Sequence, residues 1–563
     1  MLSNLPRIRA AAALRVAAAL AALLVLSSSV RAQDEPEEEE GDPAEVVIGE
    51  RLFLETRFAQ YFFANSGGDV NATLPAGDPV VDTVQTTTGS VPGPFAGQAI
   101  NCRSCHFVDD LSGVAGAGNR TYADFARRSP VPARDDGETV APRNAPALVN
   151  ASLPRGGGIL LHFDGEFASA ADLVRGTLTG RNFGWLASEQ GDAVAHIARV
   201  VREDDGSGAL AQSAGGAYRV VLAGTDPSVP RELRLPRRFR VDVARATDQQ
   251  IVDGVARLVA AYVESLVFAE DETGAFAGSP YDQFLLKNNL PRKPRPLEPV
   301  ASYVSRLRQL LAGLTELEFI SAVDGSFALH DQQFVFGPLE LDGLGIFLRQ
   351  KGLGPGVGNC VACHPPPAFT DFAVHNTGVA QLDYDTLHGE GSFAALDIPA
   401  ASVRAADPDA FLPATPAHPN ARGRFRSVPV ADDPGRADLG LWNVLLNPDL
   451  AGGRHERRLA RLVCRAQGKK PGCAREGDDA LLAGSIGLFK TPGLRDLGHS
   501  GPYNHTGSVD TLEEMVDFYS QSAGLAEDGK LRNAPPEFKR MKLGGGDIAR
   551  LAAFLRSLNE DYE

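Results

Sequence analysis

The chain has 563 residues, of which 43% are hydrophobic, so it is long enough and apolar enough to bury the cores of two or more domains. Its formal net charge of −16 argues against nucleic acid as a partner, because a phosphate backbone attracts a basic surface. The acidic balance fits a soluble exported protein whose partners carry basic patches.

The first 32 residues have the pattern of a secretory signal peptide. Three arginines make a positive front to an apolar stretch, and Val30-Arg31-Ala32 is a small-x-small cleavage site. An uncleaved membrane anchor is the alternative, although the apolar stretch is short for a helix that spans a bilayer. No later segment has the length and apolarity of a membrane span. The acidic run at 33–43 predicts a disordered tail.

The rest of the chain has the pattern of a mostly helical protein. Apolar residues recur at helical spacing in four segments, at 44–63, 248–269, 302–321 and 546–558. Strand-like runs are scarce, and glycine and proline interrupt long loops. A stretch rich in proline, lysine and arginine at 287–299 predicts a linker between two halves.

The pattern Cys-x-x-Cys-His occurs once in each half of the chain. The two copies are NCRSCH, with Cys102, Cys105 and His106, and NCVACH, with Cys360, Cys363 and His364. Zinc would need further ligands nearby, which the local sequence does not offer, and a thioredoxin-like pair does not need the histidine. The pattern is the attachment signature of c-type haem: two thiols bind the vinyl groups and the histidine lies under the iron. Two covalent haems are therefore predicted.

One haem motif in each half predicts a mostly α fold of two cytochrome c-like haem domains with long loops. The expected N-terminal domain is 44–280 and the C-terminal domain is 281–563. Cys464 and Cys473 flank a turn-rich insert, and in an oxidising compartment they are expected to form a disulfide.

Five further segments resemble the bacterial di-haem cytochrome c peroxidase and MauG superfamily. They are APRNAPALVNAS (141–152), LHFDGEFASAADLV (161–174), SPYDQFL (279–285), FTDFAVHNTGV (369–379) and FKTPGLRDLGHSGPYNHTGSVDTLEEMVDFY (489–519). The resemblance runs from about residue 45 to the end, with insertions. It implies peroxide chemistry at the N-terminal haem, electron relay at the C-terminal haem, and a calcium ion between the domains. It also implies that His106 and His364 are the proximal iron ligands.

The resemblance implies further ligands. Calcium would bind the side-chain amide of Asn144 and the backbone carbonyls of Ser500 and Pro502, all oxygen donors that suit this ion. A turn-capping role is the structural alternative for Asn144. The distal ligand of the second haem falls on Tyr519, with Met515 one helical turn earlier as the alternative. A phenolate would stabilise higher iron oxidation states, whereas a thioether would raise the reduction potential.

Three departures from the family pattern occur around the first haem. No histidine lies between His106 and His162, so the first iron is expected to have an open distal face. Phe163 replaces the tryptophan that usually lies between the haems. The distal acid that moves a proton during peroxide cleavage falls on Phe183. Candidate substitutes are Arg181, Asn182, Trp185, His162 and Glu166, with Glu189 the nearest downstream carboxylate, and each of them also has a structural explanation.

Two classes of function follow from these motifs. The first is a periplasmic redox enzyme of the peroxidase/MauG type that uses peroxide or O₂ and takes electrons from a small exported c-type cytochrome or cupredoxin. Peroxidase, protein-modifying oxidase and di-haem oxygenase with an apolar distal pocket remain open within this class. The second is a non-enzymatic di-haem electron carrier. A homodimeric state also stays open.

Overall fold

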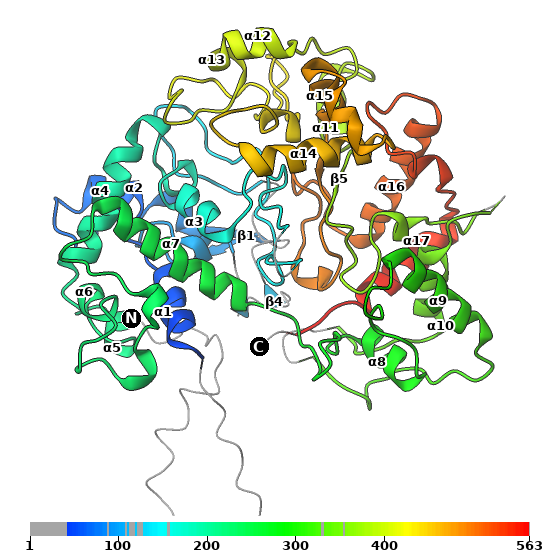
Figure 1. Ribbon diagram of the computed structural model, residues 1–563, viewed down its shortest axis with the longest axis horizontal. Helices are drawn as coiled ribbons and strands as arrows, with labels where there is room; N and C mark the ends of the chain where they lie inside the picture. The colour runs from blue at the N-terminus through cyan, green and yellow to red at the C-terminus, as the bar shows by residue number, and fades with distance from the viewer. Residues whose placement is uncertain are drawn as a thin grey trace, which may run out of the picture.

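The computed structural model describes residues 42–86, 89–106, 110–111, 119–120, 128–154, 158–327, 332–352 and 355–561. The predicted signal peptide and nearly all of the acidic tail lie outside these residues. The described chain forms an arch in which the first and last parts stand side by side and a middle part, drawn in yellow and orange, closes the top (Figure 1). Within the described residues, no helix has the length and apolarity that crossing a membrane requires.

Helices dominate the described residues, as the sequence pattern predicted. The helices are α1 Ala44–Phe53, α2 Gln60–Asn65, α3 Ala170–Leu178, α4 Gln190–Glu203, α5 Ala209–Ser213, α6 Tyr218–Val221, α7 Asp248–Ser265, α8 Pro280–Lys287, α9 Val300–Gly313, α10 Pro338–Leu348, α11 Val379–His388, α12 Ala401–Ala406, α13 Pro408–Phe411, α14 Gly453–Ala466, α15 Asp478–Ser485, α16 Leu512–Glu527 and α17 Gly545–Arg556. The strands are β1 Thr83–Thr86, β2 Gly89–Pro92, β3 Asp110–Leu111, β4 Asn119–Arg120, β5 Val374–His375 and β6 Phe489–Lys490. They form three antiparallel pairs, β1–β2, β3–β4 and β5–β6.

Two of the four predicted helices, α7 and α17, form close to their expected bounds. The start of α7 is fixed by a capping box, in which the side chains of Thr247 and Gln250 each accept the other's backbone N–H. The helix predicted at 302–321 appears as α9 but ends at Gly313, a poor helix former. The segment 288–299, between α8 and α9, is not helical, in agreement with its proline-rich composition.

The prediction of one helix over 44–63 is wrong. The chain leaves the helix after Phe53 and re-enters one at Gln60. Between them, Arg57 pairs with Glu55 at 2.6 Å and with Asp204 at 2.9 Å. These ion pairs turn the segment inward, so a buried charge network ends a helix that apolar periodicity alone would continue.

Three hydrophobic cores organise the described residues. The first lies among α1, α3, α4 and α7, where Gly49 lets α1 approach α7 so closely that a Cβ would stand 2.2 Å from the carbonyl oxygen of Leu258. The second lies among α8, α9, α10, α16 and α17. The third is built by 374–489, around Trp442 and Phe425. The sequence pattern predicted one C-terminal domain at 281–563, and it did not indicate that this range contains a third core.

A disulfide joins Cys464, near the end of α14, to Cys473 in the following turn. It fixes the loop that leaves α14 to the helix itself. The four remaining cysteines, those of the two haem motifs, are not bridged.

Candidate functional site

The first haem motif forms a single 3₁₀ turn at Cys102–Ser104, held against the end of α1. The side chain of Asn101 accepts a hydrogen bond from the last N–H of the turn at 2.9 Å and donates one to the carbonyl of Leu54 at 2.9 Å. The thiols of Cys102 and Cys105 pack against the first core, and burial raises the pKa of each to about 12. Both thiols are therefore neutral and point toward apolar surroundings.

The second motif repeats this turn at Cys360–Ala362. Asn359, in the left-handed region with φ 53°, donates from its side chain to the carbonyl of Glu537 at 2.9 Å. Burial raises the pKa of Cys360 to about 12 and raises that of Cys363 as well. Each motif thus presents two unbridged thiols from a turn that an asparagine fixes to a distant segment.

The histidines of both motifs lie in positions that suit an iron ligand. His364 is 7% exposed, and its Nδ1 donates to the carbonyl of Phe369 at 2.9 Å, which leaves the lone pair of Nε2 for a metal. Burial lowers the pKa of His364, and it lowers the pKa of His106 to about 4. Neutral imidazoles are the form that binds metals. Thiols, turn and imidazole therefore fit a covalently attached haem at each motif.

Tyr519 lies on α16 beside the second motif. Its ring packs edge-on against Phe538 at 5.8 Å, in a small apolar cluster that also contains Met541. Burial raises the pKa of its hydroxyl, and the nearby thiols of Cys363 and Cys360 raise it further. Tyr519 is therefore near both cysteines of the second haem motif. Among the described residues, Met515 is not part of this cluster.

The candidates near Phe183 are held by structural contacts. Phe183 is 3% exposed within the first core. Trp185 donates from its indole nitrogen to the carbonyl of Phe58 at 3.1 Å. Arg181 pairs with Asp136 at 2.6 Å, and Asn182 is exposed. Glu189 pairs with Arg134 at 2.6 Å and accepts a hydrogen bond from the N–H of Leu186. Trp185 and Glu189 are therefore held in structural contacts, whereas Nη1 of Arg181 is buried without a hydrogen-bond partner.

His162 and Glu166 belong to a different cluster, a buried charge network between the first and third cores. His162 Nδ1 lies 3.0 Å from Glu166 Oε2, and Arg426 pairs with the same oxygen at 2.5 Å. Although burial opposes ionisation, Arg426 and His162 hold the pKa of Glu166 well below its ordinary value. Glu166 is therefore a carboxylate, which can accept a proton but has none to donate.

Sequence reasoning missed the remainder of this network. Arg143 pairs with Asp164 at 2.6 Å and with Asp438 at 2.7 Å, and Arg426 also reaches Asp164 at 2.9 Å. The ligand atoms of His162, Asp164 and Glu166 lie within 4.8 Å of one another, but the two guanidinium groups already neutralise the acids. Arg143 and Asp164 both fall within segments that carry the family resemblance, which was the available signal.

Phe163 lies among aromatic rings at the meeting point of the segments. Its ring is 6.2 Å from that of His505, which stacks on Phe489 at 3.6 Å. The carbonyl of Phe163 accepts a hydrogen bond from the N–H of Lys490 at 2.6 Å. Burial lowers the pKa of His505 to about 3, so this ring is neutral. Among these contacts, no tryptophan or tyrosine takes the place of the tryptophan that the resemblance implies at position 163.

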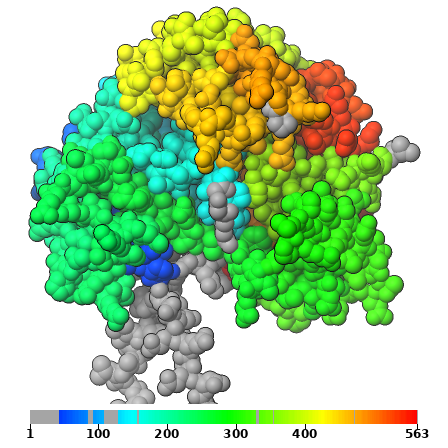
Figure 2. All heavy atoms as spheres, in the orientation of Figure 1, coloured from blue at the N-terminus to red at the C-terminus, as the bar shows by residue number. Residues whose placement is uncertain are grey.

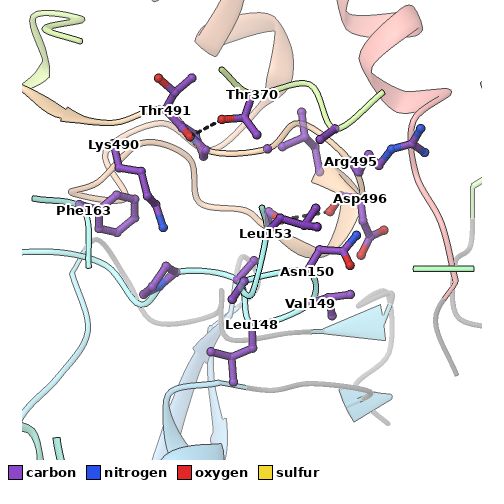
Figure 3. Close-up of a pocket in the computed structure, with 18 of the residues that line it drawn as sticks. Leu148, Val149, Asn150, Leu153, Phe163, Thr370, Lys490, Thr491, Arg495 and Asp496 are labelled. Carbon is purple, nitrogen blue, oxygen red and sulfur yellow. Dashed lines mark hydrogen bonds between the residues drawn. The ribbon is translucent and has the colours of Figure 1, made fainter. Parts of the chain in front are cut away.

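A cavity of about 210 Å³ separates the N-terminal and C-terminal segments. Figure 3 shows Phe163 and Lys490 at one end of it and Asn150 and Asp496 at the other. Asn144 lines it too, and its Nδ2 donates to the carbonyl of Pro502 at 3.1 Å. The Oδ1 of Asn144 is buried without a hydrogen-bond partner. An unpartnered amide oxygen next to a carbonyl is a donor set that fits Ca²⁺.

The predicted calcium residues are thus brought together in part. Ser500 and Pro502 both line the same cavity as Asn144. Asn150, whose two amide atoms are also buried without partners, was not identified from the sequence. It lies in the segment 141–152 and is not among the calcium ligands that the resemblance implies.

Comparison with known proteins gives a consistent set of relatives. The cytochrome-c peroxidase IdrP2 of Denitromonas iodatirespirans is 25% identical over 224 residues, 39% of this chain and 42% of that protein. The cytochrome-c peroxidase IdrP2 of Pseudomonas sp. (strain SCT) is 54% identical over 76 residues, 14% of this chain and 18% of that protein. The chain therefore matches less than half the length of these relatives. No family model matches the sequence.

Among solved structures, the diheme peroxidase BthA from Burkholderia thailandensis E264 aligns over 92% of this chain and 86% of its own. The sequence identity is 18% and the TM-score is 0.43. A MauG-like protein associated with microbial copper homeostasis aligns over 94% of this chain and 96% of its own, with 15% identity and a TM-score of 0.39.

Proposed function

We propose that this chain is a periplasmic di-haem oxidoreductase. Its curated relatives confirm the resemblance to the bacterial di-haem cytochrome c peroxidase and MauG superfamily. The observation that carries the proposal is the pair of Cys-x-x-Cys-His turns, each with two unbridged thiols and a neutral imidazole. A haem bound at each turn would supply the redox chemistry. His106 would hold the iron that meets peroxide or O₂, in a domain at 44–280. His364 would hold the relay iron, in a domain at 281–563.

The chain's own residues decide which chemistry is favoured. Phe183 makes the predicted proton-transfer position apolar, and the nearest downstream carboxylate, Glu189, is paired with Arg134. This favours, as a second candidate function, a di-haem oxygenase that binds O₂ or an apolar substrate. In either case the electrons would come from a small exported c-type cytochrome or cupredoxin, and residues 1–32 would direct export.

The proposal requires two covalent haems. The intact mass of the processed protein should exceed that of its polypeptide by two haem groups, and acid–acetone should extract neither. Replacing Cys102 and Cys105 together by serine should remove one haem and leave the other, which serves as the matched control. A single haem in the unaltered protein, or extractable haem, would contradict the proposal.

The iron coordination can be tested by electron paramagnetic resonance of the ferric protein. With no histidine between His106 and His162, one haem should give a high-spin signal, and peroxide turnover should be assayed on the same sample. Because Tyr519 lies near the cysteines of the second motif, Tyr519→Phe should alter the spectrum of the other haem only. Met515→Leu, on the same helix, should change neither. The reverse outcome for these two variants would assign the ligand to Met515.

We also propose calcium at Asn144, Ser500 and Pro502. A calcium chelator should then lower the melting temperature of the protein, with a stabilisation of about 2.7 kcal/mol lost if calcium had been at 100 times its dissociation constant. Asn144→Ala should remove the chelator's effect, because it deletes the unpartnered amide oxygen. Asn150→Ala, at the other unpartnered amide of the cavity, is the control and should leave the chelator's effect intact. Melting curves insensitive to chelator in the unaltered protein would exclude this site.

A further inference from the structure

A basic face on α14 stands out against the acidic composition of the chain. The segment 453–470, GRHERRLARLVCRAQGKK, contains seven lysines and arginines and one acid, in a protein of net charge −16. Arg454, Arg457, Arg461 and Arg465 follow one another at intervals of three and four residues, so they share one side of the helix. All four are exposed.

Most of this face is not neutralised. Arg454, Arg457 and Arg461 have no ion-pair partner among the residues that the structure describes. The opposite side of the helix is anchored, since Leu459 and Val463 are buried in the third core. The disulfide fixes the end of the helix. Arg454, Arg457 and Arg461 are therefore held on a rigid support with their charges free for another molecule.

The place of α14 connects it to both candidate haem regions. At its start, His455 donates to the carbonyl of Gly165 at 2.7 Å, and Arg458 donates to that of Ile159 at 2.6 Å, so the helix lies on the loop that carries Phe163. Near its end, Arg465 pairs with Asp371 at 3.0 Å. The N–H of Asp371 in turn donates to the carbonyl of Cys363, the second cysteine of the C-terminal motif, at 2.9 Å.

The helix also lies on the open surface. It crosses the front of the arch between the two sides, below α15 and beside β5 (Figure 1). The yellow and orange atoms around it form part of the visible face in Figure 2. A partner that contacts this face would come close to the second haem motif through Arg465, Asp371 and Cys363.

We propose that the arginine face of α14, formed by Arg454, Arg457, Arg461 and Arg465, is the docking surface for a small exported electron-transfer protein with an acidic face. This inference rests on the proposed di-haem function. It reverses the expectation from composition, which favoured a basic partner. The basic face attracts an acidic partner, while the acidic remainder of the surface repels it. The electrostatic field therefore both orients and speeds the encounter.

The test compares two triple variants of the full haem-loaded protein that change the net charge equally. The docking variant is Arg454→Glu, Arg457→Glu and Arg461→Glu. The control is Arg219→Glu, Arg231→Glu and Arg237→Glu, three exposed arginines in a segment that begins in α6, away from α14 (Figure 1). The probe is an acidic reduced c-type cytochrome, and its association rate is measured by surface binding at about 10 mM ionic strength, where the Debye length is about 30 Å.

The docking variant should associate with the acidic probe at least about tenfold more slowly than the unaltered protein, and the control should keep most of the rate. Added salt should slow the unaltered protein towards the docking variant. Equal losses in both variants, or no loss in the docking variant, would overturn the proposal. So would an unaltered protein that is dimeric and a docking variant that is monomeric, because the face would then bind a second copy.

A second readout separates this proposal from the proposed function. Peroxide turnover with a small diffusible reductant does not need a protein partner, so both triple variants should match the unaltered protein. Absent turnover in all three, together with the tenfold loss of binding, would reject the peroxidase function and retain the docking face. Normal turnover with unchanged binding would reject the docking face alone.

Discussion

Replacing Arg495 by leucine should lower the free energy of unfolding by about 3–5 kcal/mol at neutral pH. Arg495 is 3% exposed on its side chain and pairs with Asp282 at 2.8 Å and with Glu560, whose side chain is fully buried. Removing the guanidinium leaves the carboxylate of Asp282 and the buried carboxyl of Glu560 inside the protein without their cation. Breaking a buried pair costs more than the pair contributes, because the remaining charge stays desolvated.

The same arginine holds distant parts of the chain together, which increases the expected loss. It donates to the carbonyl of Pro367, near the second haem motif, and its guanidinium lies 4.0 Å from the ring centre of Phe276 in the first core. Arg495→Lys is the matched control: it keeps the charge but loses the forked geometry, so it should destabilise less than leucine. Urea unfolding followed by circular dichroism measures both. Equal stability of the leucine variant and the unaltered protein would contradict the prediction.

The cluster also predicts how stability depends on pH. Burial raises the pKa of Glu560 to about 8, from an ordinary value of 4.5, and the charge of Asp282 adds to this effect while Arg495 opposes it. The folded protein therefore keeps a proton that the unfolded chain releases above about pH 4.5. Its stabilisation is complete below that pH and is lost as the pH rises through about 8. Glu560→Gln should flatten the decline in unfolding free energy between about pH 5 and pH 9.

Local sequence patterns predicted what depends on local structure. The helix α7 and both Cys-x-x-Cys-His turns are set by residues a few positions apart, and α7 forms close to where the pattern placed it. The break between α1 and α2 depends on Asp204, which lies far along the chain from Arg57. No periodicity contains that information, so the prediction of a continuous helix over 44–63 was wrong.

Pairing between residues far apart in the chain explains the other features that the sequence did not predict. Arg143 and Asp438 come from the first and third cores, and their ion pair has no signature in either local segment. The arginines of α14 are evident in the sequence. Their position beside Asp371 and the loop of Phe163 is a property of the packed chain alone.

The unaltered protein should be a weak peroxidase with small electron donors. General acid–base assistance typically contributes about 10²–10⁴-fold to a rate, and Phe183 stands where the family resemblance implies the carboxylate that supplies it. Phe183 is buried in the core against which both cysteines of the first motif pack. Trp185 and Glu189 are bonded elsewhere, and Glu166 is held ionised, so none of these three replaces the missing acid.

Phe183→Glu should therefore raise the rate of peroxide consumption, by up to about 10²–10⁴-fold if the new carboxyl reaches the bound peroxide. Phe183→Gln is the matched control, because glutamine has nearly the same shape as glutamate and is polar but has no carboxyl proton to give. This variant should leave the rate low. The glutamate would enter an apolar core, which raises its pKa. The gain should thus be largest while the carboxyl is protonated and able to donate, and it should fall as the pH rises through the raised pKa.

The two variants and the unaltered protein should be assayed side by side, with the haem spectrum as the check on folding. Rapid peroxide consumption by the unaltered protein would show that another residue supplies the proton path. His162 would then be the first residue to replace, because Glu166 is already a carboxylate. An unchanged rate and an unchanged haem spectrum in Phe183→Glu would place this residue away from the haem. In that case the oxygenase candidate would lose its main support, since the apolar residue on which it rests would not line the site.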